Sequence, residues 1–72
     1  MNRAEHLQWC KDRAIEYVND GETTQAYASF VSDMSKHSET MNHPGLVLGA
    51  ALLFGGHLDS RLEMEKWIHG FN

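Results

Sequence analysis

The chain has 72 residues, 42% of them hydrophobic and 10% aromatic, and ten acidic against six basic side chains give a net charge of −4 at pH 7. This length predicts one small domain, residues 1–72, with the composition of a globular chain. The acidic balance argues against a nucleic-acid partner. A single cysteine, Cys10, excludes an internal disulfide and favours a reducing, cytoplasmic setting. Residues 1–16 are mixed polar, so we expect no cleavable signal peptide.

The first predicted helix covers residues 3–19. Asn2 is placed to cap it, and Glu5 follows three residues later, at the spacing of a capping box. Gly21 comes just after the last periodic residue and suits a left-handed stop. Apolar residues recur at helical spacing and form one stripe, which consists of Leu7, Cys10, Ala14, Tyr17 and Val18.

The second predicted helix covers residues 23–36, with Thr23 as its cap. Its apolar face consists of Ala26, Tyr27, Phe30, Val31 and Met34. Only a few residues separate it from the first helix. The two helices are therefore predicted to be antiparallel neighbours.

The third predicted helix covers residues 44–54 and carries no charge. Pro44 suits its first position, and the pair Gly55 and Gly56 ends it. Its eleven residues fall short of the about 20 that span a bilayer, so we expect no membrane partner.

A helix that is apolar all round is normally buried, so this third helix is expected to be the central element of the fold. If the other three helices cannot wrap it fully, its leftover face is expected to be a dimer or partner surface. The side chains expected to contact the other three helices are Leu46, Leu48, Leu52, Leu53 and Phe54. Gly45 and Gly49 lie four residues apart on one helical face, where they would let a neighbour approach closely.

The fourth predicted helix covers residues 60–69, with Ser60 and Glu63 again at capping-box spacing. Its apolar face consists of Met64, Trp67, Ile68 and Phe71, spaced i, i+3, i+4 and i+7. No run alternates between apolar and polar residues as strands do. The sequence therefore predicts an all-α fold, a compact four-helix domain.

Residues 14–36 resemble a single degenerate tetratricopeptide-like helical hairpin, through the run AIEYVNDGETTQAYASF. The matching positions are the small residues Ala14 and Ala26, the aromatics Tyr17 and Phe30, and the turn residue Gly21. Asp33 and Ser38 depart from the motif, where a small residue and a proline are usual. Such repeats need about three copies to be stable, so a single hairpin does not imply a peptide-binding groove. It implies only that the two helices pack on each other as they do in the repeat.

Three segments, EHLQWCKDRAIEY, DMSKHSETMNHPGLVLG and WIHGFN, resemble a group of short accessory proteins encoded by tailed bacteriophages. No activity or site residue of that group carries over to this chain. The resemblance implies an accessory gene product in the host cytoplasm, whose partner would be a host or anti-phage-defence protein.

His6 and Cys10 are four residues apart on the first predicted helix, so both side chains could face one metal ion. The other candidate metal ligands form no local cluster with them in the sequence; these are His37, His43 and His57. A Cys–His nucleophile would further need an orienting group and an oxyanion site, and the glycines lack a nucleotide-binding pattern. We therefore predict no catalytic residue, metal, cofactor or small-molecule substrate. The alternative, a metal-binding or cysteine/histidine-dependent protein, predicts that His6 and Cys10 converge with another histidine.

A core of this size is expected to leave some large aromatic side chains partly exposed. The residues predicted to form an interaction surface are Trp9, Tyr27, Trp67 and Phe71. The alternative, that these aromatics complete the core, stays open at this stage. The function favoured by the sequence is a non-enzymatic protein that acts by protein–protein interaction, through a homodimer or a second protein.

Overall fold

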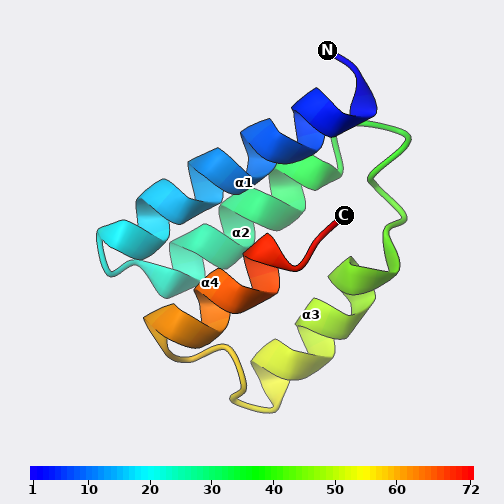
Figure 1. Ribbon diagram of the computed structural model, residues 1–72. Helices are drawn as coiled ribbons and strands as arrows, with labels where there is room; N and C mark the ends of the chain where they lie inside the picture. The colour runs from blue at the N-terminus through cyan, green and yellow to red at the C-terminus, as the bar shows by residue number, and fades with distance from the viewer.

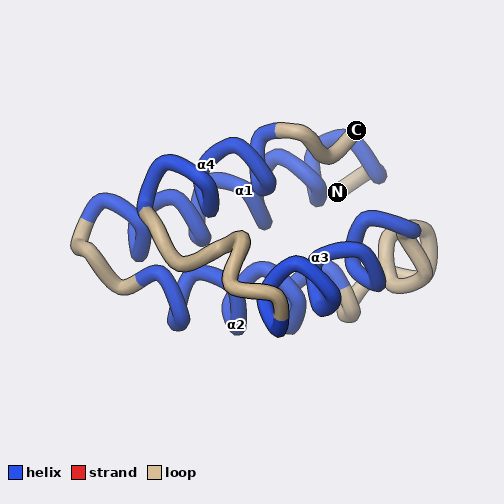
Figure 2. The backbone as a smooth tube through the Cα atoms, turned by 90° about the horizontal axis from the view of Figure 1, so that it is seen from below, coloured by secondary structure: helices blue, strands red, loops and turns tan.

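The computed structural model describes residues 1–72 and contains four helices and no strand. The helices are α1 Arg3–Asn19, α2 Thr23–Met34, α3 Pro44–Phe54 and α4 Arg61–His69 (Figure 1). The all-α prediction is confirmed. Figure 2 shows α1 and α4 at one level and α2 and α3 at the other.

The start of α1 follows from local capping chemistry. The Asn2 side chain accepts a hydrogen bond from the Glu5 backbone N–H at 2.8 Å, and the Glu5 carboxylate accepts one from the Asn2 N–H at 3.1 Å. This is the predicted capping box, and it satisfies two backbone donors that the first turn leaves unpaired. The bounds predicted for α1 are confirmed.

The ends of α2 differ from the prediction at both sides. Glu22 holds the N-cap position without a side-chain hydrogen bond, and Thr23 is already helical. The helix ends at Met34, two residues before the predicted Lys36. The reason lies at residue 40: the buried Thr40 hydroxyl donates to the Met34 carbonyl at 2.7 Å and satisfies an acceptor that a longer helix would have used.

The antiparallel hairpin of α1 and α2 is the most extensive helix pair of the fold. Gly21 makes the turn with φ +79°, a left-handed conformation that glycine adopts without strain. Ala14 and Ala26 are fully buried between the helices. Small side chains at such a contact let two helices approach closely, as the hairpin spacing predicts.

The fourth helix begins at Arg61, with Ser60 as its cap. The Ser60 hydroxyl accepts from the Glu63 N–H at 3.1 Å, which is one of the two hydrogen bonds of the predicted capping box. The Glu63 carboxylate accepts from the Ser60 hydroxyl at 3.1 Å instead of from the Ser60 backbone N–H. Met64 and Ile68 then face α1 and α2 and are fully buried. The core of eleven buried side chains comprises Leu7, Cys10, Ala14, Val18, Ala26, Phe30, Met34, Leu58, Met64, Ile68 and Phe71.

None of these core residues belongs to α3, so the prediction of a central third helix is wrong. Figure 1 shows α3 at the edge of the molecule, while α1, α2 and α4 pack on one another. Leu46, Leu52 and Leu53 pack partly against the core. Leu48 and Phe54 do not, since they are 58% and 91% exposed.

Two glycines determine how α3 attaches. A Cβ atom at Gly45 would lie 2.7 Å from Cζ of Phe71, and one at Gly49 would lie 2.7 Å from Cε2 of Trp67. Both distances are too short for real carbon contacts, so only glycine permits this approach. The predicted close approach through Gly45 and Gly49 is confirmed, at the molecule's edge instead of its centre.

The last residues of the chain join α3 to α1. The Lys11 ammonium donates to the Phe71 carbonyl at 2.5 Å, and the Arg3 guanidinium donates to the Asn72 carbonyl at 2.9 Å. The His43 ring, which caps α3 by accepting from the Gly45 N–H at 3.0 Å, also contacts the Asn72 carbonyl at 3.1 Å. The C-terminal residues thereby link the first turn of α3 to the first half of α1.

Candidate functional site

Three of the four aromatic residues predicted to form an interaction surface meet one another in a single cluster. Trp67 stacks on Tyr27 at a centroid distance of 5.5 Å and meets Phe71 edge-on at 5.0 Å. Phe30 joins both Trp67 and Phe71 edge-on, at 5.4 and 4.7 Å. Phe71 is only 4% exposed, and Tyr27 and Trp67 are partly buried. These three aromatics largely complete the core beneath α3.

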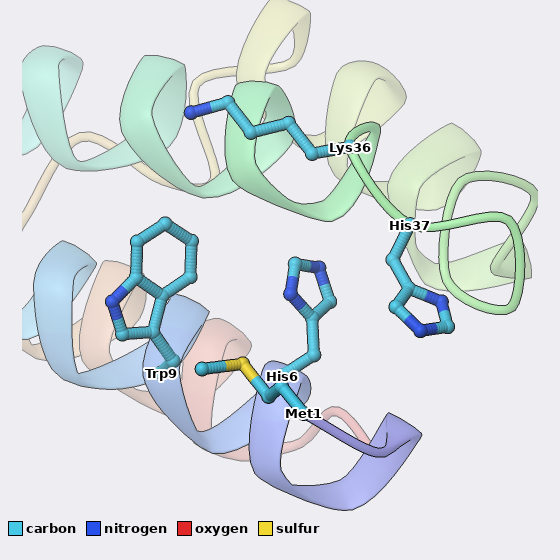
Figure 3. Close-up of a pocket in the computed structure, with 5 residues that line it drawn as sticks. All are labelled: Met1, His6, Trp9, Lys36 and His37. Carbon is cyan, nitrogen blue, oxygen red and sulfur yellow. The ribbon is translucent and has the colours of Figure 1, made fainter.

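Trp9 makes no ring contact with that cluster and has different neighbours. Its ring stacks on His6 at 5.8 Å, and the Arg13 guanidinium carbon sits 4.8 Å from its centroid. Trp9 lines a shallow cavity of about 280 Å³ together with Met1, His6, Lys36 and His37 (Figure 3). The four predicted aromatics therefore do not form one continuous surface.

An exposed apolar surface lies instead on the outer face of α3, defined here as Val47, Ala51 and Phe54. Val47 is 76% exposed, and the spacing of these residues places them on one side of the helix, away from Gly45 and Gly49. The sequence offers this surface only conditionally, as the face left over if the other three helices do not wrap the third one fully. The available signal was the pair of glycines, which marks the attached side of α3 and leaves the opposite side to solvent.

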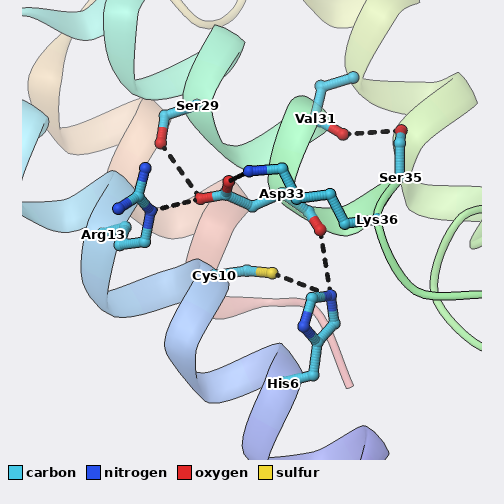
Figure 4. A network of polar contacts seen from close by, with 8 residues as sticks. All are labelled: His6, Cys10, Arg13, Ser29, Val31, Asp33, Ser35 and Lys36. Atoms are coloured by element: carbon cyan, nitrogen blue, oxygen red, sulfur yellow. Dashed lines mark hydrogen bonds and ion pairs between the residues drawn. The ribbon is translucent and has the colours of Figure 1, made fainter.

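A buried carboxylate organises the polar contacts between α1 and α2 (Figure 4). Asp33 is 1% exposed, and its carboxylate accepts from Arg13 Nε at 2.7 Å and from Lys36 Nζ at 3.0 Å. The Ser29 hydroxyl contacts the same group at 3.4 Å. A buried charge requires such partners, because desolvation alone would strongly disfavour it.

The pKa values of this pair reflect opposing effects. Burial raises the pKa of the Asp33 carboxyl, but hydrogen bonds from Arg13 and Lys36, and their charges, outweigh the burial and hold it below its ordinary value. The hydrogen bond to Asp33, together with its charge, raises the pKa of the Arg13 guanidinium. Asp33 therefore stays ionised over the whole neutral range.

His6 and Cys10 come together, but not as a nucleophile and its base. His6 Nε2 lies 3.0 Å from the Asp33 carbonyl oxygen and 3.5 Å from Cys10 Sγ. A carbonyl oxygen only accepts hydrogen bonds, so we assign the proton to Nε2, which donates it to Asp33. Nε2 then has no lone pair with which to take the thiol proton from Cys10.

The thiol of Cys10 is correspondingly inert. Burial, and then the nearby negative charge of Asp33, raise the pKa of Cys10 to about 11. We expect 5,5′-dithiobis(2-nitrobenzoate) at pH 7 to label the native protein at least about a hundredfold more slowly than the unfolded chain, because only the thiolate attacks. Absorbance at 412 nm with and without denaturant measures both rates. Rapid labelling of native protein would contradict this account.

The other histidines build no metal centre around His6 and Cys10. The His37 ring lies 5.0 Å from that of His6, so one further histidine does approach, as the metal-dependent alternative predicts. However, His37 Nδ1 accepts from the Glu39 N–H at 3.0 Å. No group of three histidine, cysteine, aspartate or glutamate side chains has a geometry that could hold a metal ion. His43 caps α3, and His57 is exposed after the glycine pair.

Comparisons with known proteins add no further constraint on function. No family model, curated protein or solved structure matches this chain. The resemblances to phage accessory proteins and to a tetratricopeptide hairpin stay predictions. No helix in the structure has the combined length and apolarity needed to cross a bilayer.

Proposed function

We propose that this chain is a small non-enzymatic protein that acts by binding another protein chain through the outer face of α3. The observation that supports this most is Phe54, a large aromatic side chain that is 91% exposed on a helix without charges. Contiguous apolar surface of this kind on a monomer marks contact sites, and aromatic residues are enriched in them.

The contacts elsewhere favour structural roles for the other candidate groups. The pair of Arg13 and Asp33 ties α2 to α1, and the aromatic cluster fixes α3. The alternative of a metal-binding or cysteine/histidine-dependent protein has one observation in its favour, the approach of the His37 ring to that of His6. We favour the binding protein because His6 Nε2 carries its proton toward Asp33. The outer face of α3 is the one prominent feature that the fold itself does not use.

The resemblance to phage accessory proteins bears on where the partner would be found. On that reading the protein works in the host cytoplasm and binds a second copy of itself, a host protein or an anti-phage-defence protein. An apolar surface without charges would select a partner by shape and burial instead of by electrostatic steering. We propose no nucleic acid, membrane or small-molecule substrate as its target.

Site-specific photo-crosslinking in cells tests this proposal. We expect p-benzoylphenylalanine at position 54 to give a discrete crosslinked product on irradiation, because Phe54 would lie in the contact. The matched control carries the same residue at Leu62, which is 60% exposed on α4. Equal yields at the two positions, or no product at position 54, would reject α3 as the contact surface.

A further inference from the structure

The outer face of α3 has a pattern that is complementary to itself. Val47 and Phe54 stand two helical turns apart, about 10.5 Å along the axis at 1.5 Å per residue. The midpoint between them falls between Ala50 and Ala51, the two smallest side chains of this segment apart from glycine. The face therefore has large side chains at its two ends and small ones at its centre.

An antiparallel copy of the same helix fits this pattern. If a two-fold axis passes between Ala50 and Ala51, Val47 of one copy lies opposite Phe54 of the other, and this contact occurs twice. The alanines at the axis allow the helices to approach to about 8 Å, the short end of the usual range. A two-fold interface uses the same surface on both subunits, so this self-complementarity is what it requires.

Charge decides which face of the molecule a second copy can approach. The molecule carries a net charge of −4, so two copies repel each other over most approaches. α3 is the one helix with no charged residue, and contact along it opposes no like charges directly. Trp67 of the charged helix α4 meets the glycine side of α3, opposite the proposed contact.

We propose that the outer face of α3 pairs with the same face of a second copy of this chain, antiparallel and about a two-fold axis near Ala51. This inference rests on the proposed function, because it names the partner of the same surface. It differs from that proposal in a specific way: the partner is the chain itself.

The area of the surface sets the strength of this dimer. A nearly fully exposed phenylalanine presents about 150–200 Å². With the Val47 and Ala51 side chains the face offers on the order of 300 Å² per copy, less than half of the ~800 Å² that each partner buries in a standard interface. We therefore expect a weak dimer whose population rises with protein concentration.

A charge exchange at Ala51 tests both the dimer and its geometry. Because position 51 lies next to its counterpart across the axis, Ala51→Glu alone and Ala51→Lys alone should each weaken self-association at least tenfold. An equimolar mixture should restore association, since each glutamate then faces a lysine. Sedimentation at about 10 and about 500 µM, with an 8.2 kDa monomer, measures all three samples and the wild type.

The control is Leu62→Glu, which places a charge on the exposed part of α4 and should leave the wild-type dimer unchanged. Both variants at position 51 are good helix formers at an exposed site and should fold, as circular dichroism will show. A wild type that is monomeric at both concentrations overturns the inference. So does a dimer that persists in Ala51→Glu or a mixture that fails to associate.

The two proposals fail in distinguishable ways. A monomeric wild type with a crosslink from position 54 to a different protein would refute the self-pairing and leave the proposed function in place. A wild type that dimerises through another face, with no crosslink at position 54, would refute both.

Discussion

Asp33→Ala is expected to lower the free energy of unfolding by about 2–3 kcal/mol, the cost of losing hydrogen bonds to a charged group at a buried site. The substitution removes the acceptor of Arg13 and Lys36 and leaves a cavity at the α1–α2 contact. Both cationic side chains are about half exposed, so water can solvate them again and the loss stays below that of a fully buried pair. For a chain of this size the melting temperature should fall by about 10–20 °C in thermal unfolding.

Asp33→Asn, which removes the ionisable group, should also remove a pH dependence of stability. The pKa of Asp33 is lower in the folded than in the unfolded chain, where it is 3.8, so the unfolded state binds the proton more readily. The stability contributed by Asp33 is therefore complete above pH 3.8 and disappears as the pH falls through the lower folded pKa. Urea titrations between pH 2 and 7 should show a smaller acid loss in Asp33→Asn than in wild type, and no such difference in Asp59→Asn, which alters an exposed carboxyl.

The elements of this fold could largely be predicted from the sequence because their signals are local. The Asn2 and Glu5 box, Pro44 at the first position of α3 and the turn at Gly21 each act within four residues of the chain. The end of α2 could not be predicted in this way. Its last carbonyl is satisfied by Thr40, whose position depends on the path of the following loop.

The position of α3 was beyond sequence reasoning for a different reason. The amphipathic helices α1, α2 and α4 each carry one apolar stripe, and three stripes suffice to close a core. α3 is apolar on every side, so its pattern does not say which face is inward or whether it is central. The inward face is determined by Trp67 and Phe71, which pack against Gly45 and Gly49. These aromatic residues lie about 20 residues further along the sequence, so the pattern of α3 itself does not reveal the contact.

The candidate site was predictable in kind but not in place. Exposed apolar surface was expected on a domain of 72 residues, yet Trp9 and Trp67 proved to lie in separate surroundings. Asp33 was noticed only as a departure from the tetratricopeptide pattern. Its position three residues after Phe30, on the apolar face of α2, was a usable signal, because an acid there must find a cation on the facing helix.

Gly49→Leu is expected to destabilise the protein by about 2–3 kcal/mol, at the upper end of the cost of overpacking a well-filled contact. The new side chain would overlap the indole of Trp67, which cannot move aside because Tyr27 stacks on it and Phe30 meets it edge-on. Replacing a glycine within a helix stabilises the helix by about 0.8–1 kcal/mol. The expected decrease in the free energy of unfolding already includes this gain. Thermal unfolding followed by circular dichroism measures the difference.

We expect α3 to move away from α4 in response to this overlap, because α3 makes few contacts with the other helices. The buried Nε1 donor of Trp67 also has no acceptor in the contact, so exposing it to water loses no hydrogen bond. In a Trp9→Phe background Trp67 is the sole tryptophan, so lifting should shift its fluorescence emission to longer wavelength. Ala51→Leu is the matched control at a protein concentration at which the chain is monomeric: it enlarges an exposed position two residues along the same helix and should change stability by less than about 0.5 kcal/mol. Unchanged melting and emission in Gly49→Leu would show that α3 is not held by its glycine face, and the assignment of Val47, Ala51 and Phe54 to an outer face would fall with it.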